Sequence, residues 1–174
     1  MKAPYRVGDK IYLRALEKSD AATLTPWFND LEITRNLTRW RPLSVESEEG
    51  FIAALADQPH DLVLGICERA SDALVGVTGL HGFGPPDLKA MFGIAVAKHA
   101  QGKGYGSETT RLMVEIAFRT LNVHRVWLEV YTRNAAGIRA YEKAGFVREG
   151  VLRESVFRDG EWLDVALMGI LRPS

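Results

Sequence analysis

Six residues, QGKGYG, from Gln101 to Gly106, place three glycines beside a lysine and a tyrosine. They follow the apolar, partly β-branched residues Met91–Val96 and precede Ser107–Leu121, where apolar side chains recur at helical spacing. A strand that turns through glycines into a helix presents bare N–H groups at the positive end of the helix dipole, which suits an anion and above all phosphate. We therefore predict a phosphate-binding loop. A tight turn without a ligand is the alternative.

Two common phosphate motifs do not fit this loop. The nucleotide P-loop requires Ser or Thr after its lysine, and Lys103 is followed by Gly104. The dinucleotide fingerprint G-x-G-x-x-G would need glycine where Ser107 stands, and it expects a parallel βαβ unit near the N-terminus. The loop therefore predicts a different phosphate ligand.

Asn134 and Tyr141 form a second candidate pair. They are seven residues apart in an expected helix, so at ~100° per residue they share one face, about 10 Å apart along the axis. An amide and a phenol so placed could touch two points of one extended ligand. Two alternatives stay open: Asn134 serves only as a helix cap, and Tyr141 serves only as a core aromatic.

Periodicity and turn signals predict the elements that position these residues. The expected strands are Ile11–Leu16, Asp61–Glu68, Ala73–Gly82, Ala90–Val96, His124–Tyr131, Phe146–Phe157 and Glu161–Leu171. The expected helices begin at Ser19 or Asp20 as N-cap, at Ser44 (through about Ala56), at Tyr105 and at Asn134, with Thr34–Ser44 irregular. Helices and strands alternate only in the middle of the chain, which predicts a mixed α/β or α+β sheet.

Bulk composition narrows the class of protein. The 174 residues predict one domain spanning 1–174, and 22 basic residues balance 22 acidic ones, which argues against nucleic acid or membrane as partner. Cys67 forbids an internal disulfide, and the four histidines lack metal-ligand spacing, so we expect no metal. Without a signal-like or membrane-spanning apolar run, the expected location is cytoplasmic.

These motifs resemble the GNAT (Gcn5-related) N-acetyltransferases. Their acetyl-CoA loop reads Q/R-x-x-G-x-G/A, matched by Gln101, Gly104 and Gly106. The stretch LEVYTRNAAGIRAYEKAGF is similar to the family pattern L-E-V-x-x-x-N-x-x-A-x-x-x-Y-x-x-x-G-F, with Gly137-Ile138 in place of the commoner Ala-Ile. The order of elements also resembles the GNAT fold. That fold implies a mostly antiparallel seven-stranded sheet, flanked by about four helices and splayed at its fourth and fifth strands.

The resemblance implies an acetyl-CoA-dependent transferase that acetylates an amine directly in a ternary complex. The pattern looks most like ribosomal-protein and protein N-terminal acetyltransferases, and the tail EGVLRESVFRDGEWLDVALMGIL also resembles relatives acting on polyamines or small amines. The alternatives are a polyamine or antibiotic acetyltransferase and a CoA-binding sensor without catalysis. The family also implies a homodimer.

The family's cofactor contacts carry over to this sequence by position. Pantetheine would lie along Ile94, Ala95 and Val96 and meet Asn134. The N–H groups expected to hold the pyrophosphate are those of Gly102, Lys103, Gly104, Tyr105, Gly106 and Ser107. Gln101 would shape the loop, and Lys103 would either add positive charge or simply be solvated.

The resemblance places Tyr141 beside the thioester sulfur as general acid, and Glu129 matches the Glu of L-E-V that serves some members as base. An ordinary Glu titrates near ~4.3, so burial or a like charge would have to raise its pKa. Glu129 could equally be a plain polar strand residue. Many relatives carry another glutamate base two residues before the glycine of this strand, where this chain has Met91.

The acceptor slot is expected between the loop joining the first two helices and the last hairpin. These segments hold Asn36, Arg39, Trp40 and Arg41, then Phe157, Arg158 and Trp162. Aromatic and arginine side chains could grip a peptide backbone or a carboxylate, which favours a protein N-terminus or an amino-acid-like amine over a polyamine. The alternative is that the arginines are solvated surface residues.

Overall fold

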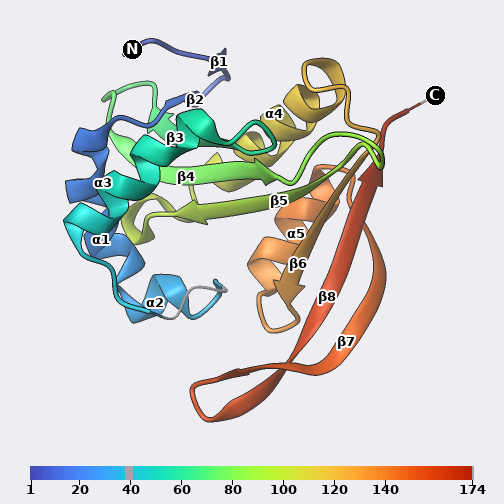
Figure 1. The fold of residues 1–174 in the computed structure, drawn as a ribbon. Coiled ribbons are helices and arrows are strands. Elements are labelled where there is room, and N and C mark those ends of the chain that lie inside the picture. The colour runs from blue at the N-terminus through green and yellow to red at the C-terminus, as the bar shows by residue number, and fades with distance from the viewer. Residues whose placement is uncertain (38–40, 174) are drawn as a thin grey trace.

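The computed structural model describes residues 1–37 and 41–173, and eight of their strands form one sheet (Figure 1). The strand order is β1-β2-β3-β4-β5-β6-β8-β7, and every neighbouring pair is antiparallel except the parallel pair β5 and β6. The strands are β1 (Arg6–Val7), β2 (Ile11–Ala15), β3 (Leu62–Glu68), β4 (Leu74–His81), β5 (Lys89–Val96), β6 (Arg125–Tyr131), β7 (Val147–Arg158) and β8 (Glu161–Leu171).

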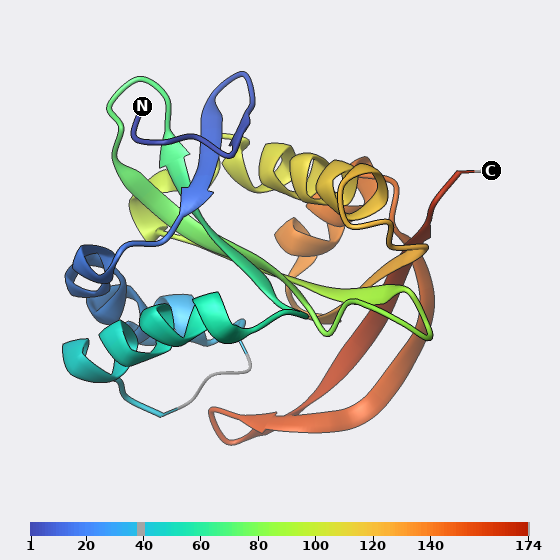
Figure 2. The ribbon, with the colours of Figure 1, turned by 45° about the horizontal axis from the view of Figure 1, so that its top comes forward.

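Helices cover both faces of the sheet. They are α1 (Ala21–Phe28), α2 (Leu31–Thr34), α3 (Val45–Ala54), α4 (Tyr105–Arg119) and α5 (Ala135–Lys143). Figure 2 shows α1 and α3 on one side of the sheet and α4 and α5 on the other. A buried polar or apolar side chain on a strand therefore faces one of two distinct helical layers.

The α+β class, the mostly antiparallel sheet and its splay between the fourth and fifth expected strands are confirmed. The expected count of seven strands was one too low. The additional strand is β1, whose Arg6 and Val7 pair with Leu13 and Tyr12. Two residues are too few to produce a recognisable alternation, so the pattern could not reveal this edge strand.

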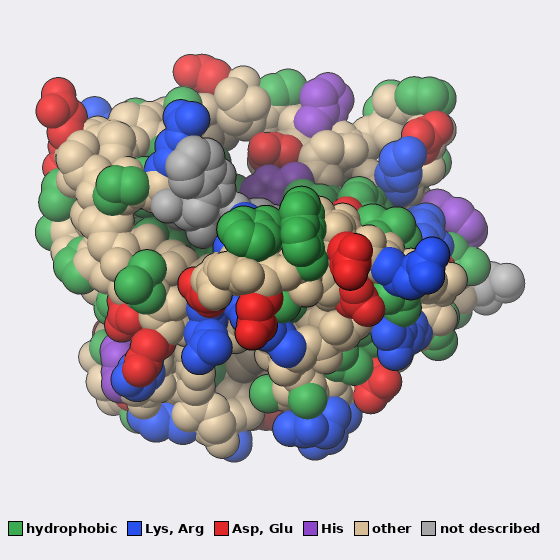
Figure 3. All heavy atoms as spheres, turned by 90° about the horizontal axis from the view of Figure 1, so that it is seen from below, with side chains coloured by type: hydrophobic (Ala, Val, Ile, Leu, Met, Phe, Trp, Pro, Cys, Tyr) green, Lys and Arg blue, Asp and Glu red, His purple; other side chains and the backbone are tan. Residues whose placement is uncertain are grey.

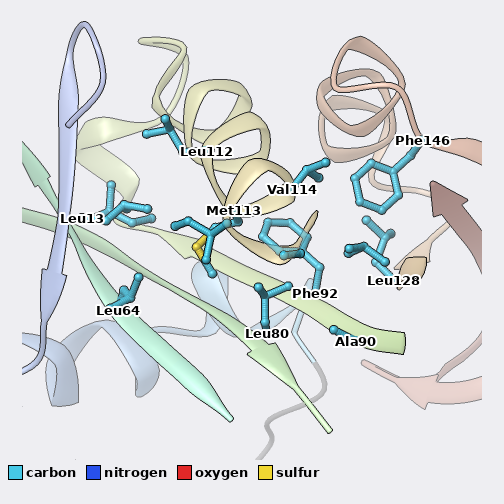
Figure 4. Close-up of a cluster of buried hydrophobic side chains, with 14 of the residues drawn as sticks. Leu13, Leu64, Leu80, Ala90, Phe92, Leu112, Met113, Val114, Leu128 and Phe146 are labelled. Atoms are coloured by element: carbon cyan, nitrogen blue, oxygen red, sulfur yellow. The ribbon is translucent and has the colours of Figure 1, made fainter. Parts of the chain in front are cut away.

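The main core lies between the sheet and α4. Leu112, Met113, Ile116 and Ala117 of α4 are buried, as their helical spacing predicts. Figure 4 shows Met113 close to the sheet, with Leu80 of β4 and Phe92 of β5 on the same side. Burying side chains of this size contributes about 1.5–3 kcal/mol each, which holds β4 and β5 firmly under α4.

Asp20 is the N-cap residue of α1, one of the two candidates expected, but its side chain makes no capping hydrogen bond. Its carboxylate instead accepts hydrogen bonds from the Arg14 guanidinium at 2.7 and 2.8 Å and from the Glu17 N–H at 2.8 Å. Arg14 is buried on β2, and a buried guanidinium needs a charged partner more than a helix end needs a cap. The pair joins β2 to the start of α1.

The other local signals are confirmed. Ser44 caps α3 by accepting from the Ser47 N–H, and Gly145 ends the α5 region at a φ of 97°. Asp159 and Gly160 have φ values of 53° and 83°, the left-handed geometry of a two-residue hairpin turn. This turn joins β7 to β8 in a long hairpin that extends away from the helices (Figure 1).

Three further findings concern the described residues as a set. None of their helices is long and apolar enough to cross a membrane. They contain no group of three His, Cys, Asp or Glu side chains that could hold a metal ion. Cys67 is buried in β3 as a free thiol.

Candidate functional site

The two central strands separate part of the way along the sheet. The ladder between β5 and β6 consists of Lys89 with Arg125, Ala90 with Val126 and Met91 with Trp127. The following residues of β5 keep their pairing with β4 through Val96 but have no ladder partner on β6. The segment expected to bind pantetheine, 94–96, is half-buried and lies on this unpaired edge. An open strand edge offers its main-chain groups to an extended ligand.

The glycine loop follows directly and has the geometry of an anion site. Gly102 and Gly104 have φ values of 76° and 88°, which side-chain-bearing residues rarely adopt. Gln101 connects the loop back to β5, because its Nε2 donates to the Val96 carbonyl at 3.1 Å. Within the described chain, no protein acceptor pairs with the N–H groups of residues 102–107. Six donors thus gather at the N-terminus of α4.

Lys10 is a charged neighbour of this loop that sequence reasoning missed. Its ammonium group donates to the Lys103 carbonyl at 3.2 Å. Glu108, in the first turn of α4, accepts from the backbone N–H groups of Asp9 and Lys10 and so fixes the β1–β2 turn against the helix. No local signal could have found Lys10, because it lies 93 positions from Lys103 in the chain.

The side chain of Tyr105 is buried and does not face the loop surface. Its hydroxyl donates to Glu68 in a hydrogen bond that raises the pKa of Tyr105. Only its N–H group remains at the loop. Lys103 is exposed, with its ammonium group 5.9 Å from the centre of the Tyr105 ring, so its charge is free to meet an anion.

Asn134 caps α5 with its side-chain oxygen, and its side-chain amide nitrogen is a second polar group at the same site. Its Oδ1 accepts from the Gly137 N–H at 3.0 Å. Its Nδ2 makes no hydrogen bond within the described residues and lies where a Cβ on residue 137 would approach to 2.7 Å. Glycine at 137 therefore leaves room for this side-chain position.

Tyr141 of α5 packs against β5, the strand that carries the open edge. Its ring packs edge-on against Phe92 of β5, with centroids 6.1 Å apart and an interplanar angle of 86°, and also against Phe146. Its hydroxyl has no hydrogen-bond partner in the described part of the chain. Burial raises the pKa of Tyr141 to about 12, so the phenol keeps its proton at neutral pH. A free, protonated phenol beside the gap can act as a proton donor.

Glu129, the expected base, is not buried, which removes one of the two influences that its role could draw on. Val126, Leu128 and Val130 point into the core, as their alternation predicts, and Glu129 is exposed on the opposite face of β6. Burial therefore cannot desolvate this carboxylate.

The segments expected to frame the acceptor do converge at the end of β6. Tyr131 donates from its hydroxyl to the Leu37 carbonyl at 3.0 Å, and Arg133 donates to the Arg35 carbonyl at 2.7 Å. Arg133 also lies 3.6 Å from Asp159 at the hairpin turn.

Of three residues expected to bind the acceptor, Arg39, Trp40 and Trp162, one lies in the described part of the chain. Trp162 is 61% exposed and packs against Phe157 with ring centroids 5.3 Å apart. Arg39 and Trp40 lie outside the described residues, so the structure says nothing of them.

The chain is similar to known acetyltransferases in both sequence and structure. The family model described as an acetyltransferase (GNAT) domain matches residues 10–147. The chain is similar to the probable N-acetyltransferase YjcK of Bacillus subtilis, at 37% identity over 95% of this chain and 96% of the relative. It is also similar to the spermidine N(1)-acetyltransferase of Vibrio cholerae, at 30% identity over 95% of each. A crystal structure of the spermidine N-acetyltransferase from Vibrio cholerae, in complex with CoA and spermine, superposes with a TM-score of 0.87. In that comparison the identity is 28%, covering 94% of this chain and 96% of the other.

Proposed function

We propose, from the premise that this chain belongs to the GNAT family of acetyltransferases, that it transfers the acetyl group of acetyl-CoA directly to a primary amine in a ternary complex. The observation that carries the proposal is the gap between β5 and β6, which ends in the unpaired N–H groups of the glycine loop. One continuous surface thus offers a strand edge, an anion site and the phenol of Tyr141.

The described residues fit acetyl-CoA along this surface. The N–H groups of residues 102–107 suit the diphosphate, and Lys10 and Lys103 bring positive charge to it. The free edge of β5 suits the amides of pantetheine, and the spare Nδ2 of Asn134 suits a carbonyl of the same arm. When bound, acetyl-CoA supplies the activated acetyl group.

In the proposed reaction the amine attacks the thioester carbon, its C–N bond forms and the C–S bond breaks. Tyr141 donates its phenolic proton to the departing sulfur. Its pKa of about 12 keeps the phenol protonated until the C–S bond breaks, and the proton that it gives up is replaced from the attacking amine.

For the acceptor, we propose a protein N-terminus or an amino-acid-like amine. Arg133 stands where the α2 segment and the hairpin turn meet, and Phe157 and Trp162 present an exposed aromatic pair beside that turn. A guanidinium suits a carboxylate or a peptide carbonyl. A polyamine is the second candidate, because the chain is similar to spermidine acetyltransferases and the exposed carboxylate of Glu129 would suit a cation.

The test is a thiol-release assay with acetyl-CoA and a panel of peptide N-termini, amino acids and polyamines, with products identified by mass spectrometry. We expect turnover with at least one peptide or amino acid. Thermal shift with acetyl-CoA, ATP and NAD accompanies it, and acetyl-CoA alone should raise the unfolding temperature. Stabilisation by ATP or NAD but not by acetyl-CoA would overturn the proposal.

A further inference from the structure

Met91 of β5 cannot accept a proton, but a histidine lies opposite it on β4. In the ladder between β4 and β5, the residue paired with Met91 is His81. Met91 is also the last β5 residue paired with β6, so His81 lies level with the point where the two strands separate.

His81 faces away from α4. Its neighbour Leu80 is fully buried in the core beneath α4, close to Met113 (Figure 4), and successive strand residues point to opposite faces. Tyr141 belongs to α5, which lies on the same side of the sheet as α4 (Figure 2), and its ring packs against Phe92 of β5. The histidine and the tyrosine therefore flank the gap from opposite faces of the sheet.

Asp61 holds the imidazole in place. Its Oδ2 lies 3.3 Å from His81 Nδ1, and its Oδ1 accepts a hydrogen bond from the Gly82 N–H at 2.9 Å. A carboxylate beside Nδ1 favours the proton on that nitrogen and leaves Nε2 with a lone pair. In the described chain, Asp61 is the charged group within ion-pair distance of His81, while Met91 and Trp127 beside it carry no charge.

Nε2 is directed along β4 toward the opened part of the gap. A Cβ on Gly79 would lie 2.5 Å from Nε2, so the ring folds back over Gly79 and needs glycine there. Gly79 pairs with Gly93 of β5, two residues beyond the last β5–β6 pair. Figure 3 shows that the molecule is hollowed on its lower side, with histidine and acidic side chains in the hollow. Both side chains of the pair are 34% exposed, so solvent and a substrate amine can reach them.

We propose that His81 is the general base of this enzyme and that Asp61 is the residue that positions it. The inference rests on the proposed function. The incoming ammonium loses two protons as its nitrogen bonds to the acetyl carbon. One passes to His81 Nε2 and then to solvent, and the other replaces the proton that Tyr141 gives to the sulfur. The sum is an amide, a thiol and one released proton, and no further reactant is needed. Imidazole suits this task because the lone pair of Nε2 can accept a proton while Nδ1 stays hydrogen-bonded to the carboxylate.

The experiment measures kcat and acetyl-CoA affinity for four variants with an acceptor that the parent enzyme uses. His81→Gln and His81→Ala should lower kcat roughly 10²-fold, the usual scale for loss of a general base, and leave acetyl-CoA affinity unchanged. Added imidazole should restore at least a tenth of the parent kcat to His81→Ala. Asp61→Asn should lower kcat less, because the base remains but loses its orientation.

His60→Gln is the matched control. His60 lies next to Asp61 in the chain, but its Nδ1 is 2.8 Å from the Phe83 carbonyl and not at His81. The kcat of the His60→Gln variant should therefore equal that of the parent enzyme. A kcat within tenfold of the parent in His81→Gln, or no recovery with imidazole in His81→Ala, would overturn the assignment. Failure of the proposed function looks different, because the parent enzyme itself would then release no thiol with any acceptor.

Discussion

Met91 of β5 pairs with Trp127 of β6, and this is the last pair in the ladder between the two strands. Beyond it, β5 follows β4 as far as Val96, whereas β6 follows β8 as far as Tyr131. Each strand keeps one partner and loses the other, so the sheet opens without either strand ending. Both proposed proton-transfer groups meet this opening, Tyr141 through Phe92 and His81 through its pairing with Met91.

Tyr141→Phe should lower kcat by roughly 10²-fold or more while acetyl-CoA affinity stays within twofold of the parent's. The phenyl ring keeps the edge-on contact with Phe92 and loses only the proton donor. Because burial raises the pKa of Tyr141 to about 12, its ionisation should not reduce kcat anywhere below about pH 11. Steady-state kinetics and isothermal titration calorimetry measure the two quantities, and an unchanged kcat would remove Tyr141 as general acid.

Asn134→Ser should separate the two roles of this residue. Serine caps helices about as well as asparagine, so the free energy of unfolding should change by only a few tenths of a kcal/mol. The amide Nδ2 is lost, so the KM for acetyl-CoA should rise several-fold. Asn134→Ala should show the same raised KM as Asn134→Ser, and its free energy of unfolding should also fall by about 1 kcal/mol. If the serine variant keeps the parent KM, Asn134 is only a cap.

Gly106→Ala tests whether a ligand approaches the loop closely. A Cβ at this position meets no protein atom within 4 Å, and alanine favours the helix, so stability should be unchanged or rise by up to about 1 kcal/mol. Acetyl-CoA affinity should nevertheless fall, because the methyl group occupies the face on which the diphosphate would rest.

Gly104→Ala provides the contrast. Gly104 has a φ of 88°, so alanine there should cost roughly 1–2 kcal/mol of stability as well as affinity. Urea unfolding and calorimetry measure both effects. Unchanged affinity in Gly106→Ala would place the cofactor elsewhere.

Lys10→Ala should weaken acetyl-CoA binding about tenfold, the scale of one hydrogen bond to a charged group. Its ammonium group already lies at the Lys103 carbonyl, beside the unpaired N–H groups. The difference should shrink as salt is raised, because exposed charges are screened. Lys18→Ala, which removes an exposed lysine before α1, is the control and should bind as the parent does. Equal affinities for the two variants would contradict a role for Lys10.

Asp20→Asn should destabilise the fold by about 3–5 kcal/mol, because it leaves the Arg14 guanidinium buried without a counter-charge. Burial opposes ionisation of Asp20, but hydrogen bonds from Arg14 and the Glu17 N–H outweigh it and hold the pKa of this carboxyl below its usual value. The pair therefore stabilises the fold above about pH 4, and this contribution is lost as pH falls through the lowered pKa. Urea unfolding at pH 7 and pH 3 should show that the free energy of unfolding falls less between these two pH values in the variant than in the parent.

Features that depend on neighbouring residues were predictable. The glycine loop, the buried face of α4, the Asn134 cap and the Asp159-Gly160 turn each follow from backbone preference or from the period of apolar residues. Such signals extend over a few residues, so the sequence indicates them directly. The same reasoning found Asp20 as the N-cap residue of α1 but not the partner of its carboxylate, which is an arginine on the preceding strand.

By itself, the sequence determined the order of the longer elements, the glycine loop and the shared face of Asn134 and Tyr141. Only the tertiary structure decided which charges meet them. The backbone of Lys10 is held beside the loop by Glu108, 98 positions away in the chain. His81, at the end of β4, contacts Asp61, which directly precedes β3. Contacts of this kind depend on how strands align and how helices pack on them, and burial of the core fixes that alignment without leaving a local pattern in the residues it brings together.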